Sequence, residues 1–159
     1  MGSGKSTIAR HLSKQLPNTY FLDTDSLIEH FENQTIPEIF ATQNEEYFRN
    51  AEKRVFSWIC KNVSNTIIST GGGLPVYVPE IKTAGVVVYL KVAFEDILQR
   101  LSSQELSNRP LFQDIQKAKQ LFIKRDAIYT QLADFTIVNN DLDTTTNEIL
   151  QIINSKDIL

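Results

Sequence analysis

The sequence predicts an α/β fold in which a mostly parallel β-sheet lies between two layers of helices. Short apolar segments of strand length alternate with longer segments of helical periodicity along the whole chain of 159 residues. The chain also opens with Gly-Ser-Gly-Lys-Ser-Thr, a pattern typical of a phosphate-binding loop at the start of a helix. No repeat or linker interrupts the pattern, so we expect a single domain over residues 1–159.

Each strand is predicted from a short β-branched or apolar segment that ends in acidic, glycine or polar residues. These segments are 20–22, 66–69, 86–90 and 135–138. Each helix is predicted from apolar residues at helical spacing, and Thr35, Pro37 and Glu38 carry the signals of a helix start. The expected helices are 7–16, 26–31, one beginning after Thr35, 45–61, 94–101, 114–132 and 143–155.

The composition indicates a soluble domain without a nucleic-acid or membrane partner. Hydrophobic residues make up 42% and charged residues 22% of the chain, and the net charge of −3 provides no basic field for nucleic acid. No apolar segment approaches the length of a membrane span or the pattern of a signal peptide. We therefore expect a cytoplasmic location, and we expect a monomer. Cys60, the single cysteine, and Trp58 lie in an apolar helical stretch and are expected in the core.

The first residues are expected to bind ATP. Glycines let consecutive backbone N–H groups curl around phosphate oxygens, and the amino end of the following helix adds partial positive charge. In this pattern the lysine reaches the β- and γ-phosphates and the following hydroxyl holds Mg²⁺. A glycine-rich turn that only caps a helix would not require that lysine and hydroxyl. The expected ATP-binding residues are Gly2, Ser3, Gly4, Lys5, Ser6 and Thr7.

Two further groups follow strands and are expected at the same edge of the sheet. Asp23 and Asp25 come after the first strand, where they would point to the same side, and Gly71 to Gly73 come after the second. One aspartate could hold Mg²⁺ through water while the other accepts a proton from a substrate hydroxyl. The alternative is that both acids cap the next helix. The glycines would let a substrate approach the backbone, or would form only a flexible loop.

Three arginines are candidates for binding an anion, because a guanidinium can bind a carboxylate or phosphate through two parallel hydrogen bonds. Most arginines lie on solvated surfaces. Arg49 lies among aromatic residues, and Arg125 lies between Phe122 and Tyr129 on a helix, which favours sheltered positions. Arg109 lies in the polar segment 102–113, which suits a lid that closes over the phosphates.

In their order along the chain, these motifs resemble those of the shikimate kinase family. The resemblance spans nearly the whole chain, and the motifs that carry it are the phosphate loop, Asp23-Thr24-Asp25, Phe48-Arg49, Ser69 to Gly73, Asn108-Arg109-Pro110-Leu111 and Arg125. It implies ATP-dependent phosphorylation of the 3-hydroxyl of shikimate, in the pathway to chorismate and the aromatic amino acids. It also implies a P-loop fold like that of nucleoside monophosphate kinases.

The resemblance further implies a role for each candidate residue. Ser6 and, through water, Asp23 would hold Mg²⁺, while Lys5 and Arg109 would meet the phosphates. Arg100 would stack on the adenine, near residues 139–141. Asp25 would bind the shikimate hydroxyls and act as base or orienting group. The other substrate-binding residues would be Arg49 and Arg125, which would bind the carboxylate, and Gly71, Gly72 and Gly73, with a backbone N–H donated by Gly72. The substrate-binding region would cover about 26–55.

Two alternatives remain. The first is another P-loop kinase, for gluconate or a nucleotide, against which the Asp-Thr-Asp and triple-glycine motifs argue. The second is an inactive nucleotide-binding remnant, because the full loop pattern has a glycine five residues before Gly4 and this sequence starts three before it. The strand that feeds such a loop is also missing, and its loss from the middle of a sheet would leave both neighbours unpaired. A start assigned at an internal methionine would produce the same sequence.

Overall fold

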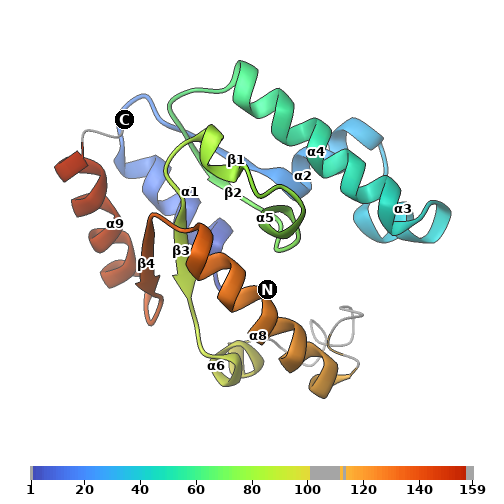
Figure 1. The fold of residues 1–159 in the computed structure, drawn as a ribbon. Coiled ribbons are helices and arrows are strands. Elements are labelled where there is room, and N and C mark those ends of the chain that lie inside the picture. The colour runs from blue at the N-terminus through green and yellow to red at the C-terminus, as the bar shows by residue number, and fades with distance from the viewer. Residues whose placement is uncertain (1, 101–111, 113, 157–159) are drawn as a thin grey trace.

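The computed structural model describes residues 2–100, 112 and 114–156. Helices and strands alternate in it as predicted (Figure 1). In chain order they are α1 (Lys5–Gln15), β1 (Tyr20–Asp23), α2 (Thr24–Glu32), α3 (Ile36–Thr42), α4 (Glu45–Asn62), β2 (Thr66–Ser69), α5 (Leu74–Tyr77), the 3-10 helix η1 (Ile81–Ala84), β3 (Val88–Lys91), α6 (Phe94–Arg100), α8 (Ile115–Leu132), β4 (Phe135–Val138) and α9 (Leu142–Lys156). The short helices α5 and η1 were not predicted.

The described strands form two parallel pairs. β1 pairs with β2, where Asp23 lies opposite Ser69, and β3 pairs with β4, where Val88 lies opposite Phe135. The two pairs are separate sheets, because β2 and β3 are not hydrogen-bonded to each other. The prediction of parallel strands is therefore confirmed, and the described strands form two small sheets in place of one.

A cavity of about 390 Å³ lies between the two strand pairs. Ile67 and Ile68 of β2 line it from one side, and Val88 and Leu90 of β3 line it from the other. The cavity also reaches Ser3 in the phosphate loop. We expect an apolar strand placed ahead of the loop to fit this cavity.

A five-residue apolar strand joined ahead of Met1 should stabilise the protein. Burial of large apolar side chains at about 1.5–3 kcal/mol each, together with new backbone hydrogen bonds, outweighs about 1–2 kcal/mol of backbone ordering per residue. We expect a net gain on the order of a few kcal/mol. Urea unfolding measures it, with a Gly-Ser extension of equal length as the matched control. Equal midpoints for the two extensions would show that the cavity does not accept a strand.

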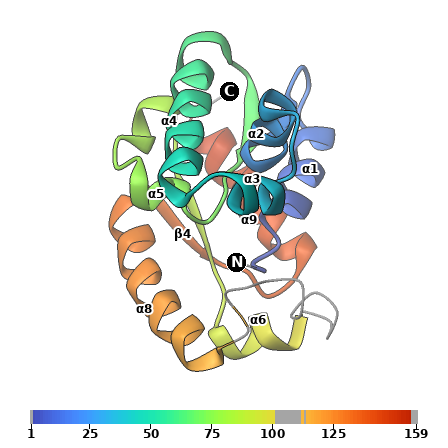
Figure 2. The same cartoon turned by 90° about the vertical axis from the view of Figure 1, so that its right-hand side faces the viewer.

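Helices cover both faces of the strands, which gives the predicted three layers (Figure 2). α1 and α9 pack together on one side, while α4, α5 and α8 pack along the other. The β3 region alternates accordingly, since Val88 and Leu90 join the core with α1 and α9, whereas Val87 packs in the cluster beneath α4 and α5. This alternation follows from the two-residue period of an extended chain.

A second core supports the segment before the glycine loop. Ile28 of α2, Ile39 of α3, and Phe48 and Val55 of α4 are buried together. α3 begins with the capping box predicted from Thr35 and Glu38: each side chain accepts a hydrogen bond from the other residue's backbone N–H. α2, α3 and α4 therefore form a packed unit from which Arg49 projects.

The expectation that Cys60 and Trp58 are buried is wrong. Cys60 is exposed, and Trp58 is 40% exposed and meets the ring edge of Phe31 on the outside of α4. The buried stripe of α4 includes Val55, Phe56 and Ile59, and each residue turns about 100° around a helix. Cys60 and Trp58 fall beside this stripe.

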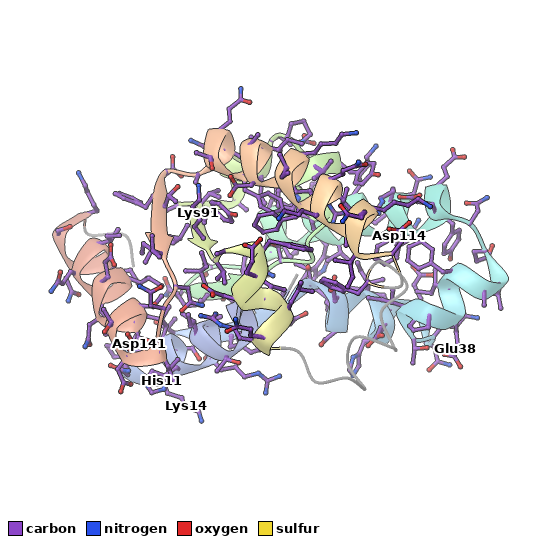
Figure 3. All side chains as sticks on the ribbon, turned by 90° about the horizontal axis from the view of Figure 1, so that it is seen from below. His11, Lys14, Glu38, Lys91, Asp114 and Asp141 are labelled. Atoms are coloured by element: carbon purple, nitrogen blue, oxygen red, sulfur yellow. The ribbon has the colours of Figure 1, made fainter. Side chains whose placement is uncertain are left out.

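Charged side chains lie on the outside of the molecule, together with exposed apolar residues such as Tyr20 and Ile123. Lys14 and Glu38 point away from the body in Figure 3, and both are exposed. Among the described helices, none combines the length and apolar character needed to cross a membrane.

Candidate active site

The phosphate loop leads directly into α1. Gly4 is the N-cap residue of that helix and has a left-handed backbone with φ of 78°, a conformation that favours glycine. Asn139, which follows β4, donates its side-chain N–H to the carbonyl of Ser3 at 2.5 Å and accepts the Thr145 hydroxyl at 3.0 Å. The end of β4 thereby holds the loop in place.

Arg100 lies beside the segment predicted to meet the adenine. Its Nη2 donates to the backbone carbonyls of Asn139 and Asn140, at 2.8 and 3.4 Å. The structure thus brings Arg100 and residues 139–141 together, although they lie far apart in the sequence. Asn139 also contacts Ser3, so this one residue connects Arg100 to the phosphate loop.

Asp23 accepts three hydrogen bonds through its two carboxylate oxygens. Oδ1 accepts the backbone N–H groups of Asp25 and Ser26, at 3.1 and 3.3 Å, and so caps α2. Oδ2 accepts the Ser6 hydroxyl at 2.7 Å, and Ser69 lies 3.0 Å from the same hydroxyl. The capping alternative is therefore correct for Asp23, but it accounts for only one of the two oxygens.

The pair of Ser6 and Asp23 fits the expected magnesium site. Mg²⁺ prefers oxygen ligands and commonly binds one or two carboxylates together with substrate phosphates and water. A hydroxyl and a carboxylate oxygen 2.7 Å apart beside the phosphate loop match that donor set. In the described part of the chain, no group of three His, Cys, Asp or Glu residues forms a metal site by itself.

Asp25 lies in the first turn of α2 rather than on the strand. The expectation that both aspartates project from one side of a strand is therefore wrong, because the cap formed by Asp23 starts the helix at Thr24, two residues earlier than predicted. Burial, followed by the negative charge of Asp23, raises the pKa of Asp25, while the nearby Lys5 opposes this shift. The residue is thus a sheltered carboxylate with increased proton affinity.

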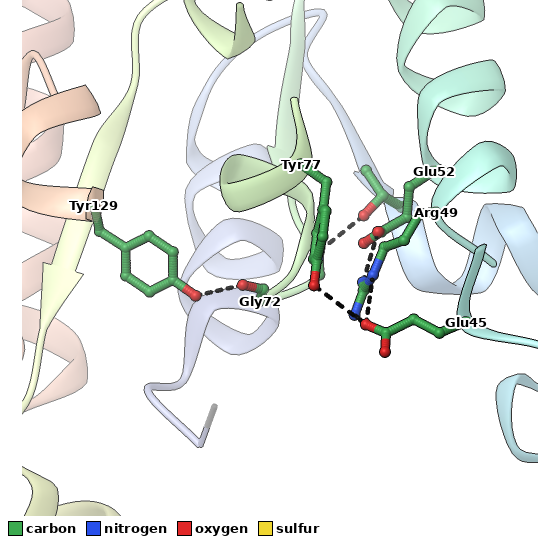
Figure 4. Close-up of polar contacts among 8 residues, drawn as sticks. Glu45, Arg49, Glu52, Gly72, Tyr77 and Tyr129 are labelled. Atoms are coloured by element: carbon green, nitrogen blue, oxygen red, sulfur yellow. Dashed lines mark hydrogen bonds and ion pairs between the residues drawn. The ribbon is translucent and has the colours of Figure 1, made fainter. Parts of the chain in front are cut away.

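The three glycines bring the acid and the arginines together. A Cβ at residue 71 would collide with a carboxylate oxygen of Asp25, and a Cβ at residue 73 would collide with the guanidinium of Arg49. Between them, the carbonyl of Gly72 accepts a hydrogen bond from Tyr129, one turn beyond Arg125 on α8 (Figure 4). The glycine loop therefore adjoins all three predicted substrate-binding elements, and the close approaches explain the glycines at 71 and 73.

Arg49 is held by two carboxylates of its own helix. Its Nη1 donates to Glu52 at 2.7 Å, while Nε and Nη2 both donate to Oε1 of Glu45, at 3.2 and 2.8 Å (Figure 4). The guanidinium also lies 4.1 Å from the ring centre of Tyr77. These contacts fix Arg49 beside Gly73, as the sheltered sequence context indicated.

Arg125 presents a buried donor to the same region. Its Nε is buried and has no hydrogen-bond partner among the described residues. Arg125 lines the cavity together with Gly71 and Gly72. A buried donor without a partner is costly, and an anionic ligand would satisfy it.

Sequence reasoning missed three residues that support this site: Thr24, Glu52 and Tyr129. The hydroxyl of the buried Thr24 accepts the N–H of Gly71 at 2.9 Å. Glu52 is only 1% exposed, and burial raises its pKa while Arg49 opposes the shift. Its spacing of three residues from Arg49, within an apolar stripe, was a usable signal. No comparable signal in the sequence marks Thr24 or Tyr129, apart from the predicted site residues beside them.

Arg109 and nearly all of the predicted lid lie outside the described residues. Phe112, the one described residue of 102–113, is buried in a cluster with Val92, Phe94 and Ile97. The expected role of Arg109 therefore stays a prediction.

Comparison with known proteins identifies the family. A family model described as shikimate kinase matches residues 1–154. The chain belongs to the shikimate kinase family. It is 43% identical over 141 residues to a shikimate kinase of Helicobacter hepaticus, covering 89% of this chain and 83% of the relative. It is 39% identical over 154 residues to one of Clostridium botulinum, covering 94% and 89%.

Solved shikimate kinases have the same fold. The enzyme of Acinetobacter baumannii in complex with shikimate superposes with a TM-score of 0.88 at 36% identity, covering all of this chain and 91% of that one. The enzyme of Aquifex aeolicus superposes with a TM-score of 0.83 at 34% identity, covering 99% and 94%. The resemblance to a P-loop phosphotransferase family is thereby confirmed for both sequence and fold.

Proposed function

We propose that this protein transfers the γ-phosphoryl group of ATP to the 3-hydroxyl of shikimate, giving shikimate 3-phosphate and ADP. The observation that carries the proposal is the glycine loop, against which Asp25, Arg49 and the helix of Arg125 all pack. An acid and two arginines suit a substrate that carries both hydroxyls and a carboxylate. Family membership and the shikimate-bound relative support the same substrate.

The phosphate loop would bind the donor. Backbone N–H groups of Gly2 to Thr7 and the amino end of α1 suit the phosphates, and Lys5 would contact their oxygens. Ser6 and Asp23 would hold Mg²⁺, which neutralises charge on the phosphates when bound. Arg109 would meet the phosphates from the lid, and Arg100 would contact the adenine beside residues 139–141.

Asp25 would orient the acceptor hydroxyl and accept its proton. Burial raises the pKa of this carboxyl and so increases its affinity for a proton. Arg49 and Arg125 would bind the carboxylate of shikimate, and Gly71 to Gly73 would bring the backbone against its ring. Phosphoryl transfer depends mainly on alignment and charge neutralisation, and these residues would provide both.

The partners that we propose are therefore shikimate and ATP. We also propose that the protein acts as a cytoplasmic monomer without a membrane partner, and the net charge of −3 argues against a nucleic-acid partner.

The test is a coupled assay of ADP release with Mg²⁺ and ATP, in which shikimate, gluconate and nucleoside monophosphates are compared. We expect rapid ADP release with shikimate as the acceptor, but not with gluconate or a nucleoside monophosphate. Release with gluconate or a nucleotide but not with shikimate would replace this function with that of another P-loop kinase. Nucleotide binding without turnover of any acceptor would favour an inactive remnant.

A further inference from the structure

Glu45 takes up the face of Arg49 that is suited to binding a carboxylate. A guanidinium binds a carboxylate most strongly through two parallel N–H groups. On Arg49, Nε and Nη2 form such a pair, and both donate to the single oxygen Oε1 of Glu45. The hydroxyl of Tyr77 donates to this same oxygen at 3.2 Å.

We propose that Glu45 competes with the carboxylate of the substrate for Arg49, and that Tyr77 strengthens this competition. The inference rests on the proposed function, because it assumes that Arg49 binds the carboxylate of shikimate. In this arrangement Glu45 limits the affinity of the site for its substrate: a substrate carboxylate replaces Glu45, while Arg49 itself stays in place.

The two carboxylates on Arg49 differ in the way that such an exchange requires. The side chain of Glu52 is 1% exposed and holds Nη1, so its removal would leave a buried charge unpaired. The side chain of Glu45 is 59% exposed, so it can turn into water and keep its charge solvated. Glu52 therefore acts as the fixed support of Arg49, and Glu45 as the displaceable partner.

The geometry also favours the incoming carboxylate. Glu45 uses one oxygen for both N–H groups, whereas a substrate carboxylate can offer one oxygen to each. The hydrogen bond from Arg49 and, to a smaller extent, the charge of Arg125 lower the pKa of Glu45.

Tyr77 connects this exchange to the glycine loop. It ends α5, the short helix that follows Gly73, and its ring lies 4.1 Å from the guanidinium carbon of Arg49. Its hydroxyl supplies a third hydrogen bond to Glu45 Oε1, which the substrate must also break. A ligand without a carboxylate leaves Glu45 in place and gains nothing from Arg49. The competition thereby lowers the affinity of the site for acids and leaves its affinity for other ligands unchanged.

The test is the effect of Glu45→Gln on shikimate binding, measured by calorimetry and as the shikimate KM. We expect both constants to fall by about two- to fivefold, the range of an exposed ion pair, with the ATP KM unchanged. Tyr77→Phe keeps the ring and should lower the shikimate KM by a smaller factor. Glu46→Gln is the matched control, because Glu46 is exposed in the same first turn of α4.

A purely structural role of Glu45 predicts the opposite change in shikimate affinity. If Glu45 only supports Arg49, Glu45→Gln weakens shikimate binding, and this result or an unchanged affinity overturns the inference. If Glu45→Gln gives either of these results while the unsubstituted protein phosphorylates shikimate, the proposed function is unaffected. If the unsubstituted protein does not bind shikimate, the proposed function fails and the inference with it. If Glu45→Gln does not fold, a raised or unchanged shikimate KM for Tyr77→Phe overturns the inference.

Discussion

Asp25→Asn should still bind shikimate but should lower kcat by about 10²- to 10⁴-fold, the range for loss of a general base. The amide keeps the shape of the carboxyl group and can hydrogen-bond a hydroxyl, but it cannot take up a proton at neutral pH. Coupled ADP release gives kcat, and calorimetry gives the affinity for shikimate. Turnover at the unsubstituted rate would remove Asp25 from the mechanism.

The pH dependence offers a check on this role. Asp25 must be ionised to act as base, and burial and Asp23 raise its pKa above the usual 3.8. In the unsubstituted enzyme, kcat/KM should therefore decrease as pH falls through this raised pKa. The pH profile of Asp25→Asn should lack this decrease.

The same pKa shift predicts the effect of this substitution on stability. A pKa raised by folding contributes stability below the unfolded-state value and loses it as pH rises through the folded-state value. At neutral pH the ionised carboxylate is thus unfavourable, and Asn should unfold at a higher urea concentration. Lower activity with lower stability would instead indicate a folding defect.

Arg125→Ala should raise the shikimate KM by about 10²-fold or more, because loss of one partner from a buried charge pair costs about 2–5 kcal/mol. The ATP KM should stay nearly unchanged, since the phosphate loop is built from other elements. Arg49→Ala should act in the same direction. Steady-state kinetics with each substrate varied in turn measures both constants.

Two further substitutions at and beside Arg125 serve as controls. Arg125→Lys keeps the charge but loses the planar pair of donors, so its shikimate KM should lie between those of the unsubstituted protein and Arg125→Ala. Lys124→Ala removes the neighbouring exposed cation and should change neither constant. Unchanged shikimate affinity in both alanine variants at Arg49 and Arg125 would exclude them as carboxylate ligands.

Much of the fold could be predicted because local signals agree with the packing. The segments 66–69 and 135–138 are β-branched and bounded by turn residues, and both strands form over those residues. Thr35 and Glu38 specify a helix start through contacts within a few residues, so the prediction needed no tertiary information.

The errors arise where tertiary packing decides. Residues 55–60 are apolar on most sides of α4, so composition could not identify the face that carries Cys60 as exposed. For the site, motifs located the loops and the arginines. The burial of Glu52 and the contact of Tyr129 with Gly72 depend on how distant elements meet, which no local pattern reports.

The most direct test of the account is a crystal structure of this protein with shikimate and ADP. We expect the shikimate carboxylate to bind both Arg49 and Nε of Arg125, with Glu45 turned away from Arg49 and the 3-hydroxyl beside Asp25. A shikimate molecule whose carboxylate lies away from both arginines, or whose 3-hydroxyl lies away from Asp25, would contradict the proposed site.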